Sequence, residues 1–254
     1  MVFDTRGKRK HVIRVVYAIL AILMGASLFL VVGPVNIGSL IGGSSSTSNA
    51  AAVLHEQAER IEKRLAQNPD DEQLLLALTR AQISAGNAQL EGLETAAPTV
   101  PDGAHEDFEA AQQSWSRYLK QAGDEPSASV AQLVAWTFFR LAESGSRSLG
   151  EIESNVANAK AAQQIVAEQR PTLNSLSTLA IYQFFNGEFA AGDKATKQAV
   201  AHAQEKTEAK GIEKQLAEYR KRAKKFVKQI EQVSKVEKEA NKEQLKNPFG
   251  GLGE

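Results

Sequence analysis

Hydrophobic positions divide the chain into one long apolar run followed by a series of amphipathic stretches. Residues 15–32 carry no charge and are apolar on every side of a helix. At about 1.5 Å of rise per residue, such a helix is about 27 Å long, close to the thickness of a bilayer core. The pattern predicts a transmembrane anchor over residues 15–33. A cleaved signal peptide is the alternative, but residues 28–32 stay apolar where a mature amino terminus would normally be polar.

The charges that flank this run are unequal. Five basic residues precede it, whereas the first one after it is Arg60. Cytoplasmic ends of membrane spans collect Lys and Arg, so the pattern predicts a single-pass protein of the cytoplasmic membrane. We expect residues 1–14 to lie inside and the C-terminal domain to lie outside. The residues that carry this topology signal are Arg6, Lys8, Arg9, Lys10 and Arg14.

Residues 34–49 are rich in Gly and Ser, which is typical of a flexible tether. From residue 50 onward no stretch alternates with period two, whereas apolar residues recur at steps of three and four. The chain is therefore expected to be all-α, with Gly86 and Asn87 ending one helix and Asp102 capping another. The predicted buried positions include Val53, Ala58, Ile61, Leu65, Leu75, Leu78, Phe108, Trp115, Leu119, Val134, Phe138, Phe139, Ile152, Val156, Val166, Leu176, Leu179, Phe184, Ala195 and Ala199.

Residues 53–203 resemble three degenerate tetratricopeptide repeats, which are antiparallel helix pairs of about 34 residues. The resemblance rests on residues 68–87 and on residues 171–199, whereas the middle unit, residues 126–169, matches only at its edges. It implies an α-solenoid over residues 50–204, with a concave face that grips a partner protein. The residues expected to pack the repeats are Leu78, Gly86, Leu179, Ala180, Gly187 and Ala199.

A basic, heptad-patterned helix is predicted over residues 205–246, followed by a flexible tail over residues 247–254. Its apolar seam consists of Ile212, Leu216, Tyr219, Phe226, Ile230 and Val233, together with Ala223. We expect this helix to cover the last repeat, and a coiled-coil homodimer through the same seam is the alternative. Six cations lie within residues 220–228, where they could meet anionic lipid, meet the acidic body or simply be solvated.

Charge and composition argue against several classes of function. Residues 51–204 hold twelve basic and twenty acidic residues, which argues against a protein that binds nucleic acid. Cysteine is absent, so thiol catalysis, disulfides and thiolate metal sites are excluded. The four histidines are scattered, and neither a phosphate-binding loop nor a nucleophile elbow occurs. We therefore expect a non-enzyme without metal or cofactor.

These observations together predict a membrane-anchored, non-catalytic scaffold or chaperone-like adaptor that binds proteins through its helical repeats. The layout is similar to that of single-span bacterial tetratricopeptide proteins of the YfgM type, which implies a partner among exported or membrane proteins. A self-assembling component of the cell envelope, using the C-terminal helix, is the alternative function.

Overall fold

A computed structural model describes residues 47–90 and 100–246 of the chain. The predicted basic tail and anchor, most of the predicted tether and the predicted C-terminal tail lie outside these ranges. No helix in the described ranges is both long and apolar enough to cross a membrane.

The described residues form helices and contain no strand, which confirms the predicted all-α class. The first described helix begins at Thr47, three residues inside the segment predicted to be a tether. In chain order the helices are α2 (Thr47–Leu65), α3 (Glu72–Leu90), α4 (Asp102–Gln121), α5 (Ala128–Ser144), α6 (Leu149–Gln169), α7 (Leu173–Phe185), α8 (Phe189–Ala201) and α9 (Lys206–Lys246).

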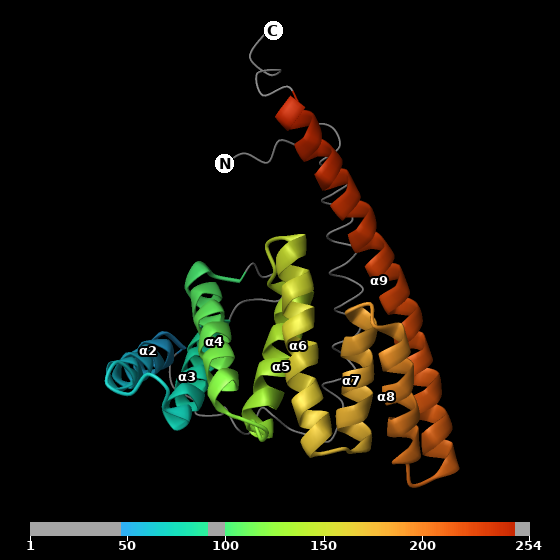
Figure 1. Ribbon diagram of the computed structural model, residues 1–254, viewed down its shortest axis with the longest axis horizontal. Helices are drawn as coiled ribbons and strands as arrows, with labels where there is room; N and C mark the ends of the chain where they lie inside the picture. The colour runs from blue at the N-terminus through green and yellow to red at the C-terminus, as the bar shows by residue number, and fades with distance from the viewer. Residues whose placement is uncertain (1–46, 91–99, 247–254) are drawn as a thin grey trace.

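The helices stack in chain order, most of them against their sequence neighbours (Figure 1). The most extensive packing is between α5 and α6, α3 and α4, α2 and α3, and α7 and α8. In addition, α3 contacts α5, and α7 contacts α9, so alternate helices also lie side by side. A chain of helix pairs in which each pair covers the next buries a continuous core that no single pair could form alone.

The core is rich in aromatic side chains between α5, α7 and α9. The rings of Phe139 and Tyr182 stack with their centroids 4.2 Å apart. Phe185 meets Phe139 edge-on at 5.8 Å and meets Phe226 edge-on at 5.4 Å. This row of four rings joins three helices that are far apart in the sequence. Such pairs contribute about 0.5–1.5 kcal/mol each beyond the area they bury.

Most of the predicted apolar faces are buried, with exceptions at exposed ends and edges. Val53 of α2 is 55% exposed and Leu119 of α4 is 36% exposed, so these two predictions are wrong. Val53 lies near the start of α2, the first described helix of the stack, which packs mainly on α3. Leu119 lies in the last turn of α4, beyond the buried Tyr118.

Two further predictions about helix ends are wrong. Gly86 does not end a helix, because α3 continues through it to Leu90. A β-carbon added at Gly86 would lie 2.7 Å from the Phe108 ring, so this glycine lets α4 approach α3 closely. Asp102 is the first residue of α4 and makes no cap, since Pro101 occupies the cap position. The Asp102 side chain instead forms an ion pair with Arg147.

The long helix α9 packs its apolar seam on α7 and α8. Leu216, Tyr219, Phe226, Ile230 and Val233 are all buried, and Ile212 is partly buried. On the α8 side, Arg220 donates two hydrogen bonds to the carboxylate of Asp193, at 2.7 and 2.9 Å. The seam is thus covered within a single chain, and a homodimer through the same residues would require α9 to leave α7.

Candidate functional site: a groove over α7

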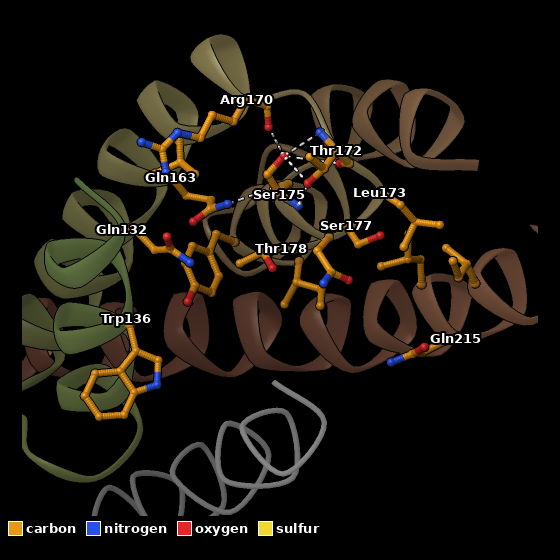
Figure 2. A pocket seen from close by; sticks show the side chains of 16 residues that line it. Gln132, Trp136, Gln163, Arg170, Thr172, Leu173, Ser175, Ser177, Thr178 and Gln215 are labelled. Atoms are coloured by element: carbon orange, nitrogen blue, oxygen red, sulfur yellow. Dashed lines mark hydrogen bonds between the residues drawn. The ribbon is translucent and has the colours of Figure 1, made fainter. Parts of the chain in front are cut away.

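A cavity of about 330 Å³ lies over α7, between α5 and α6 on one side and α9 on the other (Figure 2). We call it the α7 groove. Most of its polar lining consists of carboxamides and hydroxyls, from Gln132, Gln163, Thr172, Asn174, Ser175, Ser177, Thr178 and Gln215. Its apolar lining includes Trp136, Val166, Leu173, Ile181, Ile212 and Leu216.

The floor of the groove is held rigid at the start of α7. The Thr172 hydroxyl accepts a hydrogen bond from the Ser175 backbone, and the Ser175 hydroxyl accepts one from the Thr172 backbone, so the two form a capping box. Gln163 of α6 donates from Nε2 to the Ser175 carbonyl at 2.9 Å (Figure 2). These bonds fix α6 against the first turn of α7, so the two helices present one continuous surface.

One wall of the groove carries a half-buried aromatic ring. Trp136 on α5 is half-buried, whereas Phe138 and Phe139 on the same helix are buried. The guanidinium of Arg140, one turn later, lies 4.9 Å from the centre of the indole ring. Burial lowers the pKa of Arg140, and the nearby Glu143 partly opposes that shift. Aromatic rings and arginines are enriched in protein–protein interfaces, so this pair of side chains is suited to contact a partner.

A buried carboxylate lies further along α5. Glu143, in the last turn of α5, is buried and lies near the hydroxyls of Tyr182 on α7 and Tyr219 on α9. Burial is the main cause that raises the pKa of Tyr182, and it raises that of Tyr219 to about 12. The charge of Glu143 adds to both shifts. Both phenols therefore stay neutral at physiological pH, which suits them to a buried position beside an acid.

Charge is sparse on the groove surface itself. Arg170 is the only Lys, Arg, Asp or Glu among the lining residues, and it lies at the end of α6. The lining side chains include no imidazole and no carboxylate, the groups that usually transfer protons in active sites. One hydroxyl, that of Ser177, is buried and has no hydrogen-bond partner among the described residues. The groove thus offers neutral hydrogen-bonding groups beside apolar ones.

The residues predicted to pack the repeats lie inside the stack rather than in the groove. Leu78, Leu179, Ala180 and Ala199 are buried between helices. Gly187 forms the turn between α7 and α8 with a φ of +79°, a conformation that favours glycine. Two of the seam residues, Ile212 and Leu216, reach the groove wall. The residues of the topology signal lie outside the described ranges.

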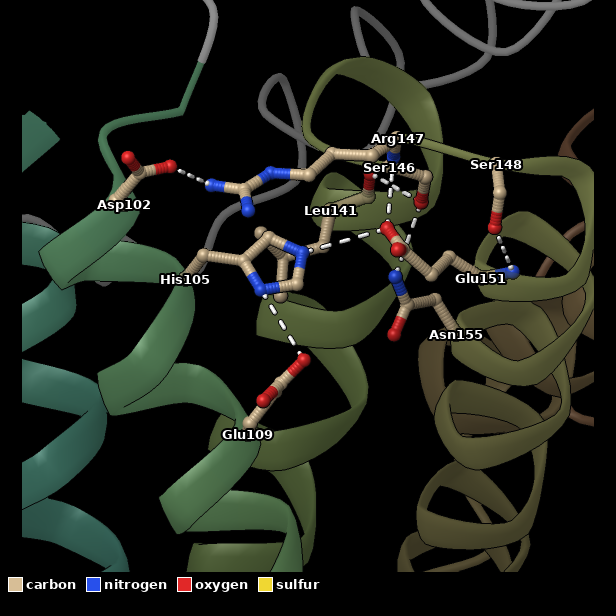
Figure 3. Close-up of polar contacts among 9 residues, drawn as sticks. All are labelled: Asp102, His105, Glu109, Leu141, Ser146, Arg147, Ser148, Glu151 and Asn155. Atoms are coloured by element: carbon tan, nitrogen blue, oxygen red, sulfur yellow. Dashed lines mark hydrogen bonds and ion pairs between the residues drawn. The ribbon is translucent and has the colours of Figure 1, made fainter.

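A second polar cluster joins α4 to the start of α6 (Figure 3). The two ring nitrogens of His105 lie 3.3 Å from carboxylate oxygens of Glu109 and Glu151. The protonated ring can donate a hydrogen bond to each of them. Glu151 also accepts a hydrogen bond from the Arg147 backbone at 2.7 Å. These contacts tie together helices whose residues are 46 positions apart.

This cluster could not be predicted from the sequence, because its members form no motif and Glu151 reaches His105 only after the helices pack. A cavity of about 370 Å³ lies beside it and is lined partly by His105, Glu109 and Glu151. His105 contacts Glu109 within α4 and contacts Glu151 across the helix boundary. Among the described residues, no group of three or more His, Cys, Asp or Glu side chains is placed to hold a metal ion. We therefore regard the cluster as a connection between neighbouring helix pairs.

The α7 groove and the His105 cluster become apparent only once the helices are packed. Comparison of the chain with protein-family models, with curated protein sequences and with solved structures returned no match.

Proposed function

We propose that the chain is a membrane-anchored, non-catalytic scaffold that binds a segment of a partner protein in the α7 groove. The observation that carries the proposal is the neutral lining of the groove. Carboxamide side chains present a donor and an acceptor together, as a peptide group does, so they can pair with the backbone of an extended segment. The half-buried ring of Trp136 would take an apolar side chain of that segment.

The proposal includes a tetratricopeptide-like arrangement of three hairpins, α3–α4, α5–α6 and α7–α8, closed by α9. The α7–α8 hairpin supports it best. Ala180 is buried, Gly187 makes the turn, and Gly192 lets α8 approach Phe184 closely. The first hairpin departs from the pattern, since Gly86 lies inside a helix. Most of the lining residues of the groove lie on the first helices of the pairs and on α9.

We place the scaffold at the outer side of the cytoplasmic membrane, anchored by residues 15–33. This placement is supported by the apolar run and by the five cations that precede it. A flexible tether beside a membrane raises the effective concentration of partners there to about the millimolar range. The partner would accordingly be an exported or membrane protein. A released domain should lose function in a complementation assay even when it stays folded.

The groove is tested by site-specific photo-crosslinking in cells. A photoreactive residue at Thr178, on the groove floor, should capture a defined set of proteins, whereas the same residue at the exposed Glu153 on α6 should not. Trp136→Ala should reduce capture from Thr178 without unfolding the chain. Equal capture from both positions would show that the partner does not bind in the α7 groove. Capture from Thr178 that Trp136→Ala leaves unchanged would show the same.

Direct binding is then measured with segments of the captured protein. Trp115 is buried in α4, so Trp115→Phe leaves Trp136 as the single tryptophan and reporter of groove occupancy. A segment that binds should shift the Trp136 emission in a saturable way. Thr178→Arg, which fills the groove, should abolish the shift. Turnover of a substrate by the purified chain would instead show that the protein is an enzyme.

A further inference from the structure

The cations within residues 220–228 of α9 differ in their surroundings. Arg220 turns toward α8 and binds Asp193, and Arg222 lies over the Tyr219 ring at 5.7 Å. Lys224 lies 5.9 Å from the centre of the Phe189 ring. Lys221, Lys225 and Lys228 are exposed. Arg220 therefore faces the body of the protein, whereas the other cations of the run are exposed, Arg222 and Lys224 beside aromatic rings and Lys221, Lys225 and Lys228 away from them.

These outward lysines belong to a longer row. An α-helix turns by about 100° per residue, which places six exposed lysines on the side of α9 opposite its buried seam. We call them the lysine row. Its central positions that are not lysine are Ala217 and Gln232, and the acidic residues nearest to it, Glu213, Glu218 and Glu231, lie at its edges. The row consists of Lys210, Lys214, Lys221, Lys225, Lys228 and Lys235.

The shape and composition of the row indicate a flat, extended partner. At about 1.5 Å per residue, the row runs about 38 Å along one straight helix. It lies on the last helix of the stack, and Figure 1 shows no further helix on its outer side among the described residues. No large apolar side chain interrupts the row, so contact would be electrostatic adsorption rather than insertion.

The local field on this helix is positive. Glu218 has a lowered pKa, chiefly because Lys221 donates a hydrogen bond to it, and the charges of Lys221, Arg222 and Lys214 add to the shift. The bond joins Lys221 Nζ to Glu218 Oε1 at 2.7 Å. One acidic residue thus interacts with several cations, and most of the row keeps its charge for an outside partner.

We infer that the lysine row docks α9 lengthwise on a membrane surface that contains anionic lipid headgroups. Lysine is a compact point charge that needs no fixed partner geometry, which suits a fluid layer of phosphates better than a shaped protein site. A bilayer also offers anions along the whole length of the row at any register. The predicted anchor of residues 15–33 would hold the same chain beside such a surface, but the row does not depend on the α7 groove.

The test uses the full chain, which contains no cysteine. Gln232→Cys, an exposed position within the row, supplies a single site for a donor fluorophore. Energy transfer is measured to an acceptor on lipid headgroups, in vesicles of phosphatidylcholine alone and in vesicles with about one third phosphatidylglycerol. Transfer should be higher in the anionic vesicles. The gain should vanish at about 1 M salt, where the Debye length is about 3 Å.

The variant for the row replaces three of its exposed lysines, in Lys214→Gln, Lys225→Gln and Lys228→Gln. Each lysine near an anionic surface contributes about fivefold in binding, so the docked population should fall about 100-fold relative to the undocked one. The control removes the same charge at the opposite end of the stack. It consists of Lys63→Gln, Arg64→Gln and Lys120→Gln, and it should keep the gain in transfer.

Equal transfer in neutral and anionic vesicles would overturn the inference, as would equal loss in the row variant and the control. Because both variants keep residues 1–46, neither the predicted anchor nor its basic flank can produce a difference between them. Circular dichroism must show that both variants are folded. If the row variant loses affinity for a labelled DNA duplex but keeps its transfer to anionic vesicles, the row binds nucleic acid and the membrane inference is wrong.

Discussion

Phe226 provides the most direct test of how α9 is held. Its side chain is 1% exposed and meets the Phe185 ring edge-on at 5.4 Å. Replacing a buried Phe by Ala removes apolar contact and leaves a cavity, which typically costs about 3–5 kcal/mol. We expect Phe226→Ala to fall in this range, because the ring also terminates the aromatic row that begins at Tyr182.

The measurement is urea unfolding of a fragment that spans residues 47–246, followed by circular dichroism. A slope of about 2 kcal/mol per molar urea converts the expected loss into a midpoint lowered by about 1.5–2.5 M. Val236→Ala is the matched control on the same helix, since Val236 is 39% exposed. Its free energy of unfolding should change by less than about 0.5 kcal/mol.

Two outcomes would refute this reasoning. An unchanged midpoint in Phe226→Ala, or an equal loss in Val236→Ala, would mean that the seam is not part of the core. A midpoint that rises with protein concentration would show that the seam joins two chains, because association stabilises a protein by mass action. The predicted homodimer would then replace the packing of α9 on α7.

Three further predictions address the glycines, the His105 cluster and the buried phenols. Gly192→Ala should lower the melting temperature, because its β-carbon would lie 2.4 Å from a neighbouring ring, whereas Gly211→Ala should raise stability by about 0.5–1 kcal/mol, since nothing lies within 4 Å. His105→Leu should lower the melting temperature by about 2–4 °C, because it removes the contacts of the imidazole with Glu109 and Glu151, and His202→Leu, at an exposed position, should leave it unchanged. The pKa of Tyr219 is raised from 10.0 to about 12 mainly by burial, so its contribution to stability is complete below pH 10 and is lost as the pH rises through about 12. Urea midpoints measured across this pH range should fall less steeply in Tyr219→Phe than in the unchanged chain, and equal slopes would contradict the assignment.

The buried faces of the helices were predictable because they are local. A step of three or four residues places apolar side chains on one side of a helix wherever that helix lies. Leu75, Val134 and Ile152 needed no knowledge of their partners to be assigned to the core. The same pattern wrongly predicted Val53 to be buried, because its exposure depends on where the stack of helices ends.

Features that depend on contacts between helices were not predictable in the same way. Gly86 carries the local signal of a helix end, yet its role is set by Phe108 in the next helix. Gln132 and Gln163 look like ordinary polar positions in the sequence and become groove lining only when α5 and α6 pack beside α7. His105 likewise gains one of its carboxylate partners, Glu151, from a distant segment. Each of these outcomes requires a tertiary neighbour that periodicity does not identify.

The position of α9 also has a consequence for the order in which the protein matures. The α7 groove takes its first wall from α5 and its last from Ile212, Gln215 and Leu216 on α9. During synthesis from the amino terminus, the groove is therefore incomplete until α9 has emerged and docked. Occupancy and docking are thermodynamically linked, so a bound segment should slow the release of α9 and protect its amides from hydrogen exchange.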